Sequence, residues 1–198
     1  IPDSRTMRSI VFCVLALALL PNLSYAQAPV FTVTPGESTV KFFVKSSVAL
    51  AGKFDKWDAT LTFPSTDVTT GVLNITIHAA SVDTGNGIKN DRLRSKEFFN
   101  VKHDPLITFR STKGVQTGPL TFKVAGNFTI RGVTKPETLM LTVFDKGTRS
   151  GIITGVMTFN RDDFGMNKGI PFVRIGDHVD VTVKLKVKRV SGSPVVFK

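Results

Sequence analysis

The sequence of 198 residues contains a single cysteine, Cys13, and no cysteine follows it. Residues 27–198 therefore cannot form a disulfide, offer a thiolate nucleophile or hold a metal through sulfur. Histidine is also scarce: His78, His103 and His178 are the only three, and no two of them stand at a metal-ligand spacing. We therefore expect no metal site.

Catalytic motifs are missing as well. The sequence holds no nucleophile elbow, no Walker loop and no dinucleotide-binding fingerprint. Adjacent carboxylates occur at Asp162 and Asp163, but they follow Arg161 in a glycine-containing loop, where a turn or an ion pair explains them. We expect a protein that is not an enzyme. Catalytic groups that meet from distant positions remain the alternative.

The N-terminus carries an apolar run, residues 10–20, which follows a basic start at Met7 and precedes a small-x-Ala site that ends at Ala26. Such a run is too short to cross a bilayer comfortably and is typical of a secretory signal peptide. The pattern predicts that residues 1–26 comprise upstream residues and a signal peptide cut after Ala26, with an uncleaved membrane anchor as the alternative. Residues 27–198 would then form one domain that is periplasmic or secreted.

Acidic residues are few, since 15 Asp and Glu stand against 26 Lys and Arg, a net charge of +11. Without residues 1–26 the chain keeps 24 basic and 14 acidic residues, or +10. This charge favours contact with anionic membrane surfaces, phosphorylated ligands or acidic polymers, or it serves solubility alone. We expect no nucleic-acid partner for an exported protein.

Apolar and polar residues alternate with a period of two along most of the remaining chain, which predicts about eight strands, several of ten residues or more. The clearest alternation ends the series, with apolar residues at Val179, Val181, Val183, Leu185 and Val187. Strands with one apolar and one wet face are typical of an antiparallel sheet, and closure of that sheet removes its exposed edges. We predict an all-β, eight-stranded antiparallel barrel with one or two short helical turns. A two-sheet sandwich is the alternative.

The intervening positions of that last strand carry Lys184, Lys186 and Lys188 on one face. The three lysines form a positive stripe, which is either a solvated outer face or a contact with an anionic membrane surface.

The predicted inner faces are rich in Val, Leu, Ile and Phe, with 16 phenylalanines against one tryptophan, Trp57, and one tyrosine, Tyr25. The interior of an eight-stranded barrel is either just filled by side chains or able to hold one small ligand. Apolar walls suit a solid core and a dry cavity equally, so the alternation leaves both possibilities open.

One charged segment, NDRLRSKEFF at residues 90–99, interrupts the strands. We expect one or two helical turns here, capped by Asn90 or Asp91, with an ion pair between Asp91 and Arg94 at i and i+3. The apolar residues of the segment would then cover one end of the barrel.

Four stretches in order resemble the YceI-like family: residues 38–54, 81–112, 124–141, and the pair FNRDDFGM and IGDHVDVTVKLK near the end. The resemblance spans nearly all of residues 27–198. It implies a lipocalin-like barrel whose axial cavity binds a polyisoprenoid, an isoprenoid quinone or a fatty-acid-like lipid as a carrier or sequestering protein. An envelope-surface binding module, or an enzyme acting on the bound lipid, is the alternative. The resemblance leaves a homodimer open, and it implies no cofactor beyond such a lipid.

The cavity residues that we predict on this basis are Phe42, Val44, Phe54, Trp57, Ile75, Leu93, Phe98, Phe99, Phe109, Phe128, Met157 and Phe164. Asp91, Arg92 and Arg94 would fix the cover or contact a head group. The family often has histidines where this chain has Glu37 and Ser46, so a head group would be contacted differently here.

Overall fold

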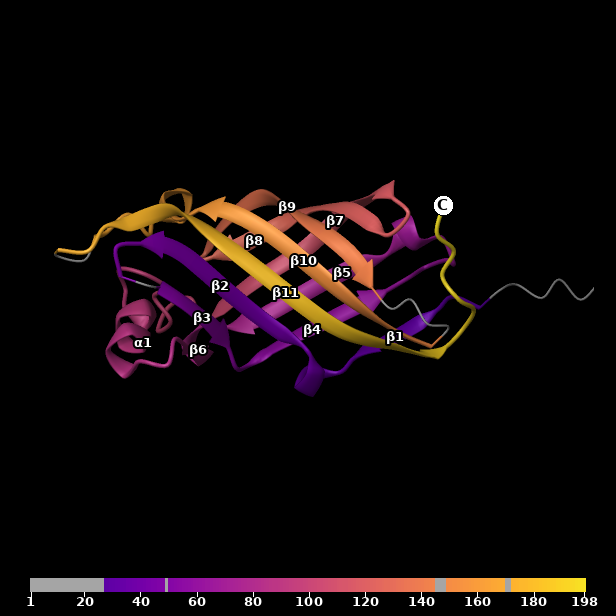
Figure 1. Cartoon of the computed structure of the whole chain (residues 1–198), viewed down its shortest axis with the longest axis horizontal. Coiled ribbons are helices and arrows are strands. Elements are labelled where there is room, and N and C mark those ends of the chain that lie inside the picture. The colour runs from indigo at the N-terminus through magenta and orange to yellow at the C-terminus, as the bar shows by residue number, and fades with distance from the viewer. Residues whose placement is uncertain (1–26, 49, 145–148, 170–171) are drawn as a thin grey trace, which may run out of the picture.

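The computed structural model describes residues 27–48, 50–144, 149–169 and 172–198. It is an elongated barrel with the helix α1 (Gly87–Arg94) at one end (Figure 1). The strands are β1 (Val30–Val33), β2 (Thr39–Ser46), β3 (Leu50–Phe54), β4 (Trp57–Thr62), β5 (Val72–His78), β6 (Val82–Asp83), β7 (Leu106–Gly118), β8 (Thr121–Ile130), β9 (Val133–Phe144), β10 (Ser150–Asn160) and β11 (Ile175–Ser191). Short 3-10 turns lie at Pro35–Glu37, Val68–Thr70, Ala79–Ser81 and Arg161–Phe164.

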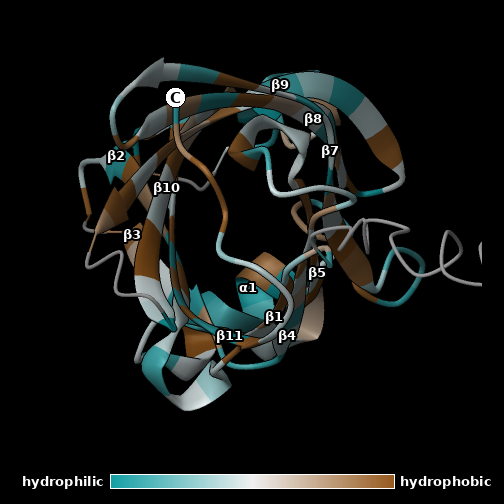
Figure 2. Ribbon diagram, turned by 90° about the vertical axis from the view of Figure 1, so that its right-hand side faces the viewer, coloured by the Kyte–Doolittle hydropathy of each residue, from teal (hydrophilic) through white to brown (hydrophobic). Residues whose placement is uncertain are grey.

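The sheet closes on itself. Eight strands follow one another in the order β1-β4-β5-β7-β8-β9-β10-β11, and β1 then pairs with β11 from Val30 opposite Ser191 to Val33 opposite Val187. The pairings within this ring are antiparallel. Figure 2 shows the ring end-on, with α1 behind it at the far end. The prediction of a closed eight-stranded antiparallel barrel is confirmed, and the two-sheet sandwich is wrong.

Three long strands are interrupted, which is why eleven segments make eight ring positions. The interrupted strands are β1 with β2, β3 with β4, and β5 with β6. β1 and β2 both pair with β11, while β3 pairs with β6 and β4 pairs with β5. The first interruption is the 3-10 turn at Pro35, whose nitrogen has no hydrogen to give a neighbouring strand. After this turn the buried hydroxyl of Ser38 donates to the Thr34 carbonyl at 2.7 Å and accepts from the Lys186 amide at 2.9 Å. That hydroxyl keeps the broken strand attached to β11.

The alternation in the sequence corresponds to the inside and the outside of the barrel. On β11, Val183, Leu185 and Val187 are buried, whereas Lys184 and Lys188 are exposed. The same rule places Gly126 of β8 inside, where a Cβ would stand 2.5 Å from the Phe109 ring. A glycine there is what allows a large ring to lie across the middle of the barrel.

One part of the wall is closed by side chains instead of backbone pairing. Pairing between β9 and β10 ends at Met140 opposite Val156. Beyond this point Phe159 lies 5.0 Å from Phe128 and 5.2 Å from Phe164, ring centre to ring centre. Phe164 is fully buried, so its ring seals the place where the strands separate.

The described part of the chain contains no helix long and apolar enough to cross a bilayer. The residues predicted to form the signal peptide, 1–26, lie outside the described residues.

Candidate ligand-binding cavities

The charged segment forms the helix α1 and a turn after it. The helix begins earlier than the sequence suggested: its cap is Asn86, whose side chain accepts from the Lys89 amide at 3.0 Å. The prediction of Asn90 or Asp91 as the cap is therefore wrong. Asn90 instead accepts at 2.8 Å from both the amide and the hydroxyl of Thr84, which attaches the helix to the strand before it.

Arginines hold this segment against the barrel. Arg94 donates to the carbonyls of Ala80 at 2.9 Å and Val82 at 3.1 Å, and it forms the predicted ion pair with Asp91 at 3.2 Å. Arg92 pairs with Glu97 at 2.5 Å, and its guanidinium carbon lies 5.6 Å from the centre of the Phe98 ring. These contacts fit the role of fixing the cover. A contact with a head group stays a prediction.

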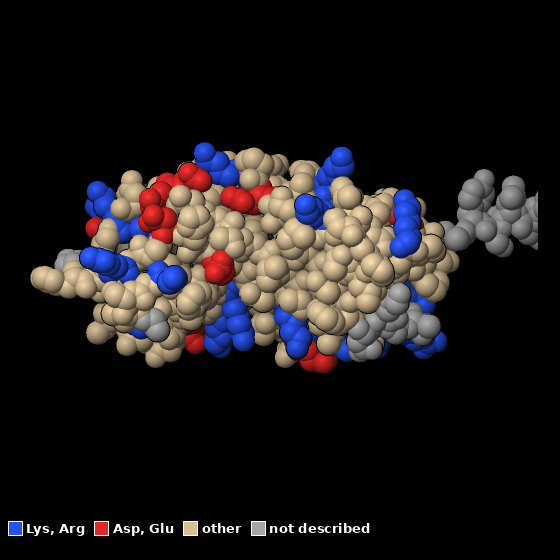
Figure 3. Space-filling model, turned by 45° about the horizontal axis from the view of Figure 1, so that its top comes forward, with Lys and Arg blue, Asp and Glu red and all other residues tan. Residues whose placement is uncertain are grey.

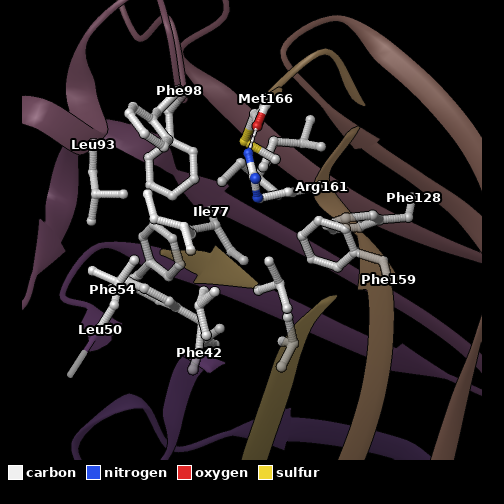
Figure 4. A pocket seen from close by; sticks show the side chains of 18 residues that line it. Phe42, Leu50, Phe54, Ile77, Leu93, Phe98, Phe128, Phe159, Arg161 and Met166 are labelled. Carbon is white, nitrogen blue, oxygen red and sulfur yellow. Dashed lines mark hydrogen bonds between the residues drawn. The ribbon is translucent and has the colours of Figure 1, made fainter. Parts of the chain in front are cut away.

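The apolar residues of the segment enter the end of the barrel. Leu93, Phe98 and Phe99 are 6%, 4% and 8% exposed, and all three line a cavity of about 60 Å³ (Figure 4). We call it the α1-end cavity. The Phe99 ring packs against Phe54 of β3 at 5.8 Å, so the cover is continuous with the barrel core.

The α1-end cavity has one charged residue in its wall, Arg161, which is 8% exposed. Its guanidinium donates to the carbonyl oxygens of Met166 and, at 3.0 Å, Gly176, and it reaches Asp177 at 3.2 Å. Figure 4 shows the Arg161 side chain turned toward Met166. With its donors directed at the backbone, Arg161 organises the loop between the 3-10 turn and β11.

Further voids continue along the barrel. A middle void of about 20 Å³ shares Ile77, Phe128 and Val181 with the α1-end cavity. Beyond it lie a void of about 60 Å³ and an adjoining cavity of about 310 Å³, which share Leu61, Phe63 and Ile153. We call the larger one the tail-end cavity. Among the residues that line these four spaces, the titratable side chains are those of Arg161 and Arg189.

The segment of residues 193–198 lies across the tail-end cavity and supplies Pro194, Val195 and Phe197 to its wall. The segment is held by backbone hydrogen bonds: the Val68 amide donates to the Val196 carbonyl at 3.1 Å, and the Val196 amide donates to Thr66 at 2.7 Å. The Phe197 ring packs against Phe122 at 6.1 Å.

An ion pair adds to this attachment, because Lys198 contacts Asp67 at 2.9 Å. Hydrogen bonds from Thr69 and then from Lys198 lower the pKa of Asp67 to about 2. The carboxylate is therefore charged at any pH in which the protein would function.

The structure places the predicted cavity residues in three groups. Those that line the α1-end cavity are Phe42, Val44, Phe54, Leu93, Phe98, Phe99 and Phe128. Ile75, Phe109 and Met157 line the middle void. Phe164 seals the wall as described above, and Trp57 is half-buried against the core; neither lines one of the four spaces. The binding role of all twelve remains a prediction.

Sequence reasoning missed the tail-end cavity altogether. Its lining comes from residues far apart in the chain, such as Phe31, Phe63, Val143 and Phe197. The signal that was available is the apolar group PVVF at residues 194–197, after the last strand. Such a group after a polar turn is typical of a segment that packs back onto the domain.

Among the described residues, acidic and histidine side chains do not gather into a metal site. In the part of the chain that the structure describes, no three His, Cys, Asp or Glu residues lie where they could hold an ion together. Glu37 is exposed in the first 3-10 turn, and the Ser46 hydroxyl donates to the Val48 carbonyl. Glu37 thus lies on the outside, whereas Ser46 is half-buried and follows Val40, Phe42 and Val44 at the inward-facing positions of β2.

Comparison with known sequences gives one family. The model of the YceI-like domain matches residues 31–187. A UPF0312 protein of Pseudomonas aeruginosa strain LESB58 is 33% identical over 123 residues, which are 59% of this chain and 63% of that protein. Protein YceI of Salmonella arizonae is 39% identical over 98 residues, 50% of this chain and 51% of that protein. The chain thus matches less than two thirds of the length of these relatives.

Solved structures show the same fold. The crystal structure of Burkholderia cenocepacia BcnA is similar with a TM-score of 0.71 and 28% identity, over 78% of this chain and 99% of that one. A polyisoprenoid binding domain from Saccharophagus degradans has a TM-score of 0.64 and 16% identity, over 81% and 99% of the two chains. The second likeness supports the fold alone.

We expect Arg161→Met to lower the free energy of unfolding by about 3 kcal/mol or more, because it leaves buried carbonyls without a donor and removes the partner of Asp177. Urea denaturation measures the loss. Arg110→Met is the matched control, since Arg110 is exposed and its side chain donates to the Thr76 hydroxyl on the surface; its effect should stay within about 0.5 kcal/mol. Equal losses in the two variants would contradict the role of Arg161.

We expect Asp67→Asn to loosen residues 193–198, because asparagine keeps an acceptor for Thr69 and loses the ion pair with Lys198. Hydrogen exchange at the Val68 and Val196 amides, corrected for the intrinsic rate, should be faster in the variant. The pKa of Asp67 is lowered from 3.8 to about 2, so in the parent the protection is fully present above pH 3.8 and is lost as the pH falls through 2.

Asp55→Asn serves as the control for this prediction, because Asp55 pairs with the exposed Lys53 and lies outside the tail-end cavity. Protection at Val196 that is the same in both variants would show that the ion pair does not hold the segment.

Proposed function

The chain belongs to the YceI-like family, and we propose that it binds one long-chain amphiphile along the barrel axis as a carrier or sequestering protein. The ligand class that fits is a polyisoprenoid, an isoprenoid quinone or a fatty-acid-like lipid. The observation that carries the proposal is the line of four apolar spaces from the α1 end to the tail end. The choice of ligand class to test is motivated by the polyisoprenoid binding domain that shares this fold.

The mostly apolar walls favour a hydrocarbon chain. Each methylene removed from water is worth about 0.8 kcal/mol, so about ten of them provide roughly 8 kcal/mol before the cost of ordering the chain. Such walls distinguish tails by length and width alone. Selection among head groups therefore depends on the ends of the barrel.

The spaces are too small for a long tail as they stand. Ligand pockets measure about 300–1,000 Å³, and only the tail-end cavity, at about 310 Å³, reaches that range. A tail that enters there must displace side chains at the middle void to reach the α1 end. Met157 is well suited to move, since a methionine side chain is unbranched and has three rotatable bonds.

The head group then belongs at the tail end, where the wall includes Ser150 and Arg189. A hydroxyl and a guanidinium favour a phosphate, a carboxylate or a carbonyl oxygen. The guanidinium of Arg189 also donates to the Gly192 carbonyl, so it is positioned beside the segment that crosses the cavity.

Transport of a lipid outside the cytoplasm is the setting that we propose. The pattern of residues 1–26 supports export to the periplasm or secretion, and the basic charge supports work near anionic envelope lipids. Arginines are the ionisable residues of the cavity walls, and a guanidinium serves there as a hydrogen-bond donor, not as a general acid or base. This composition supports binding over catalysis.

Organic extraction of protein purified without detergent, followed by mass spectrometry, tests the proposal directly. We expect an isoprenoid or another long-chain lipid in about equimolar amount, and uptake of added polyprenyl phosphate or quinone by the extracted and refolded protein. Protein that carries no lipid and also takes up none of the added amphiphiles would overturn it.

The position of the tail is tested by Met157→Phe, which fills the middle void with a stiffer side chain. In the parent, affinity for a series of prenyl phosphates from geranyl to decaprenyl should keep rising with length. In the variant it should level off at short chains, with at least about a tenfold loss for the longest. Fluorescence competition measures both series.

Met140→Phe is the matched control, because Met140 is a neighbouring methionine with 37% exposure on the outer face. Its length dependence should equal that of the parent. A Met157→Phe variant with the parental length dependence would show that tails do not pass the middle of the barrel.

A further inference from the structure

The outside of β9 and β10 carries an unusual group of apolar side chains. Phe144 and Val156 are 52% and 49% exposed, Met140 is 37% exposed, and Ile152 is half-buried. Val156 stands opposite Met140 and Ile152 opposite Phe144, and the outward pair of Thr154 and Thr142 lies between these two cross-strand pairs. We call this group the β9–β10 patch.

Lysines border the β9–β10 patch on both sides. Lys123 of β8 stands opposite Met140, while Lys186 of β11 stands opposite Ile152. Lys184 and Lys188 continue this border along β11. The other outward-facing residues paired across the strands of the patch are threonines and lysines. The nearest carboxylate on β11 is that of Asp180, which stands opposite Thr158, the next outward-facing residue of β10 after Val156 toward the α1 end.

Acidic groups lie toward the opposite end of the same wall. Asp162 and Asp163 follow β10, and burial together with the charge of Asp163 raises the pKa of Glu137 on β9. Figure 3 shows the Asp and Glu side chains of this face gathered mostly toward the α1 end, while Lys and Arg occur at both ends and flank the broad uncharged area. The acidic groups of this face therefore lie away from the β9–β10 patch.

We propose that the β9–β10 patch and its lysine border dock on an anionic phospholipid bilayer. An apolar centre with a cationic rim matches the two layers of such a surface, since apolar side chains enter the acyl boundary while lysines meet the phosphates. A second copy of the chain is a poor partner, because a two-fold contact through this face would bring the lysine borders together.

Docking through this patch would also bring the tail-end cavity close to the bilayer, and its use for lipid uptake rests on the proposed function. The inward neighbours of the patch, Val143, Gly151 and Ile153, line the tail-end cavity. The same hairpin thus presents apolar side chains to the bilayer on one face and to the cavity on the other. A lipid leaving the bilayer would meet the cavity that is large enough to receive it.

Vesicle co-sedimentation tests the docking. We expect the protein to bind vesicles of phosphatidylcholine with phosphatidylglycerol, to bind pure phosphatidylcholine vesicles much more weakly, and to be released by salt. Lys184→Gln with Lys188→Gln should weaken binding roughly 25-fold, since each lysine near an anionic surface contributes about a fivefold factor. Phe144→Ser with Val156→Thr should weaken it as well.

Lys96→Gln with Lys102→Gln is the matched control, because it removes the same charge from exposed positions near the α1 end. Equal weakening by the two lysine pairs would overturn the proposal, as would binding that is insensitive to salt or no preference for anionic vesicles. A dimer in solution that Phe144→Ser dissociates would also overturn it, in favour of contact between copies.

Uptake of polyprenyl phosphate, measured without vesicles, separates this proposal from the proposed function. Patch variants that take up ligand normally but fail to sediment with vesicles support docking as a separate property. A parent protein that sediments with anionic vesicles and takes up no ligand would leave the docking intact and overturn the proposed function alone.

Discussion

Closure of the sheet by the pairing of β1 with the end of β11 is the interaction on which the rest of the structure depends. Without it, two strands of this ring would expose unpaired amide and carbonyl groups, and the interior would be open along its whole length. β11 makes closure possible because it is long enough to pair with β10 along one side and with both β2 and β1 along the other. The break between β1 and β2, bridged by the Ser38 hydroxyl, lets one edge follow the curve of the barrel.

A closed barrel of eight strands has little spare interior, and here that interior is divided. Large side chains such as Phe109 and Met157 fill the middle, while empty space remains toward both ends. The filled middle buries apolar surface in the absence of a ligand, which stabilises the empty protein. A bound tail would replace those contacts with its own. Ligand affinity in such a barrel therefore depends on the difference in free energy between the interior packed with its own side chains and the interior packed around the tail.

Charge is distributed by the same inside–outside rule. Arg161 and Arg94 are directed at backbone carbonyls and serve as ties between segments, whereas the lysines of β11 stand on the outer face. The distinction follows from chemistry, since a guanidinium carries several donors in a fixed plane and an ammonium is strongly hydrated. A basic sequence thus contains cations that tie segments together, such as Arg161 and Arg94, and cations on the outer face, such as the lysines of β11.

The sequence by itself determined the strands, the faces of each strand and the family, because period-two alternation and short motifs are local properties of the chain. Alternation also predicted eight strands correctly, because the short segments β1, β3 and β6 continue the strands β2, β4 and β5 and add no position to the ring. Only the tertiary structure decided the cap at Asn86, the partners of Arg161, the sizes of the cavities and the path of residues 193–198. Most of these depend on contacts between residues far apart in the chain, and volumes of empty space depend on how all the side chains pack at once. For that reason the tail-end cavity was invisible in the sequence, although alternation indicated most of the strands that form it.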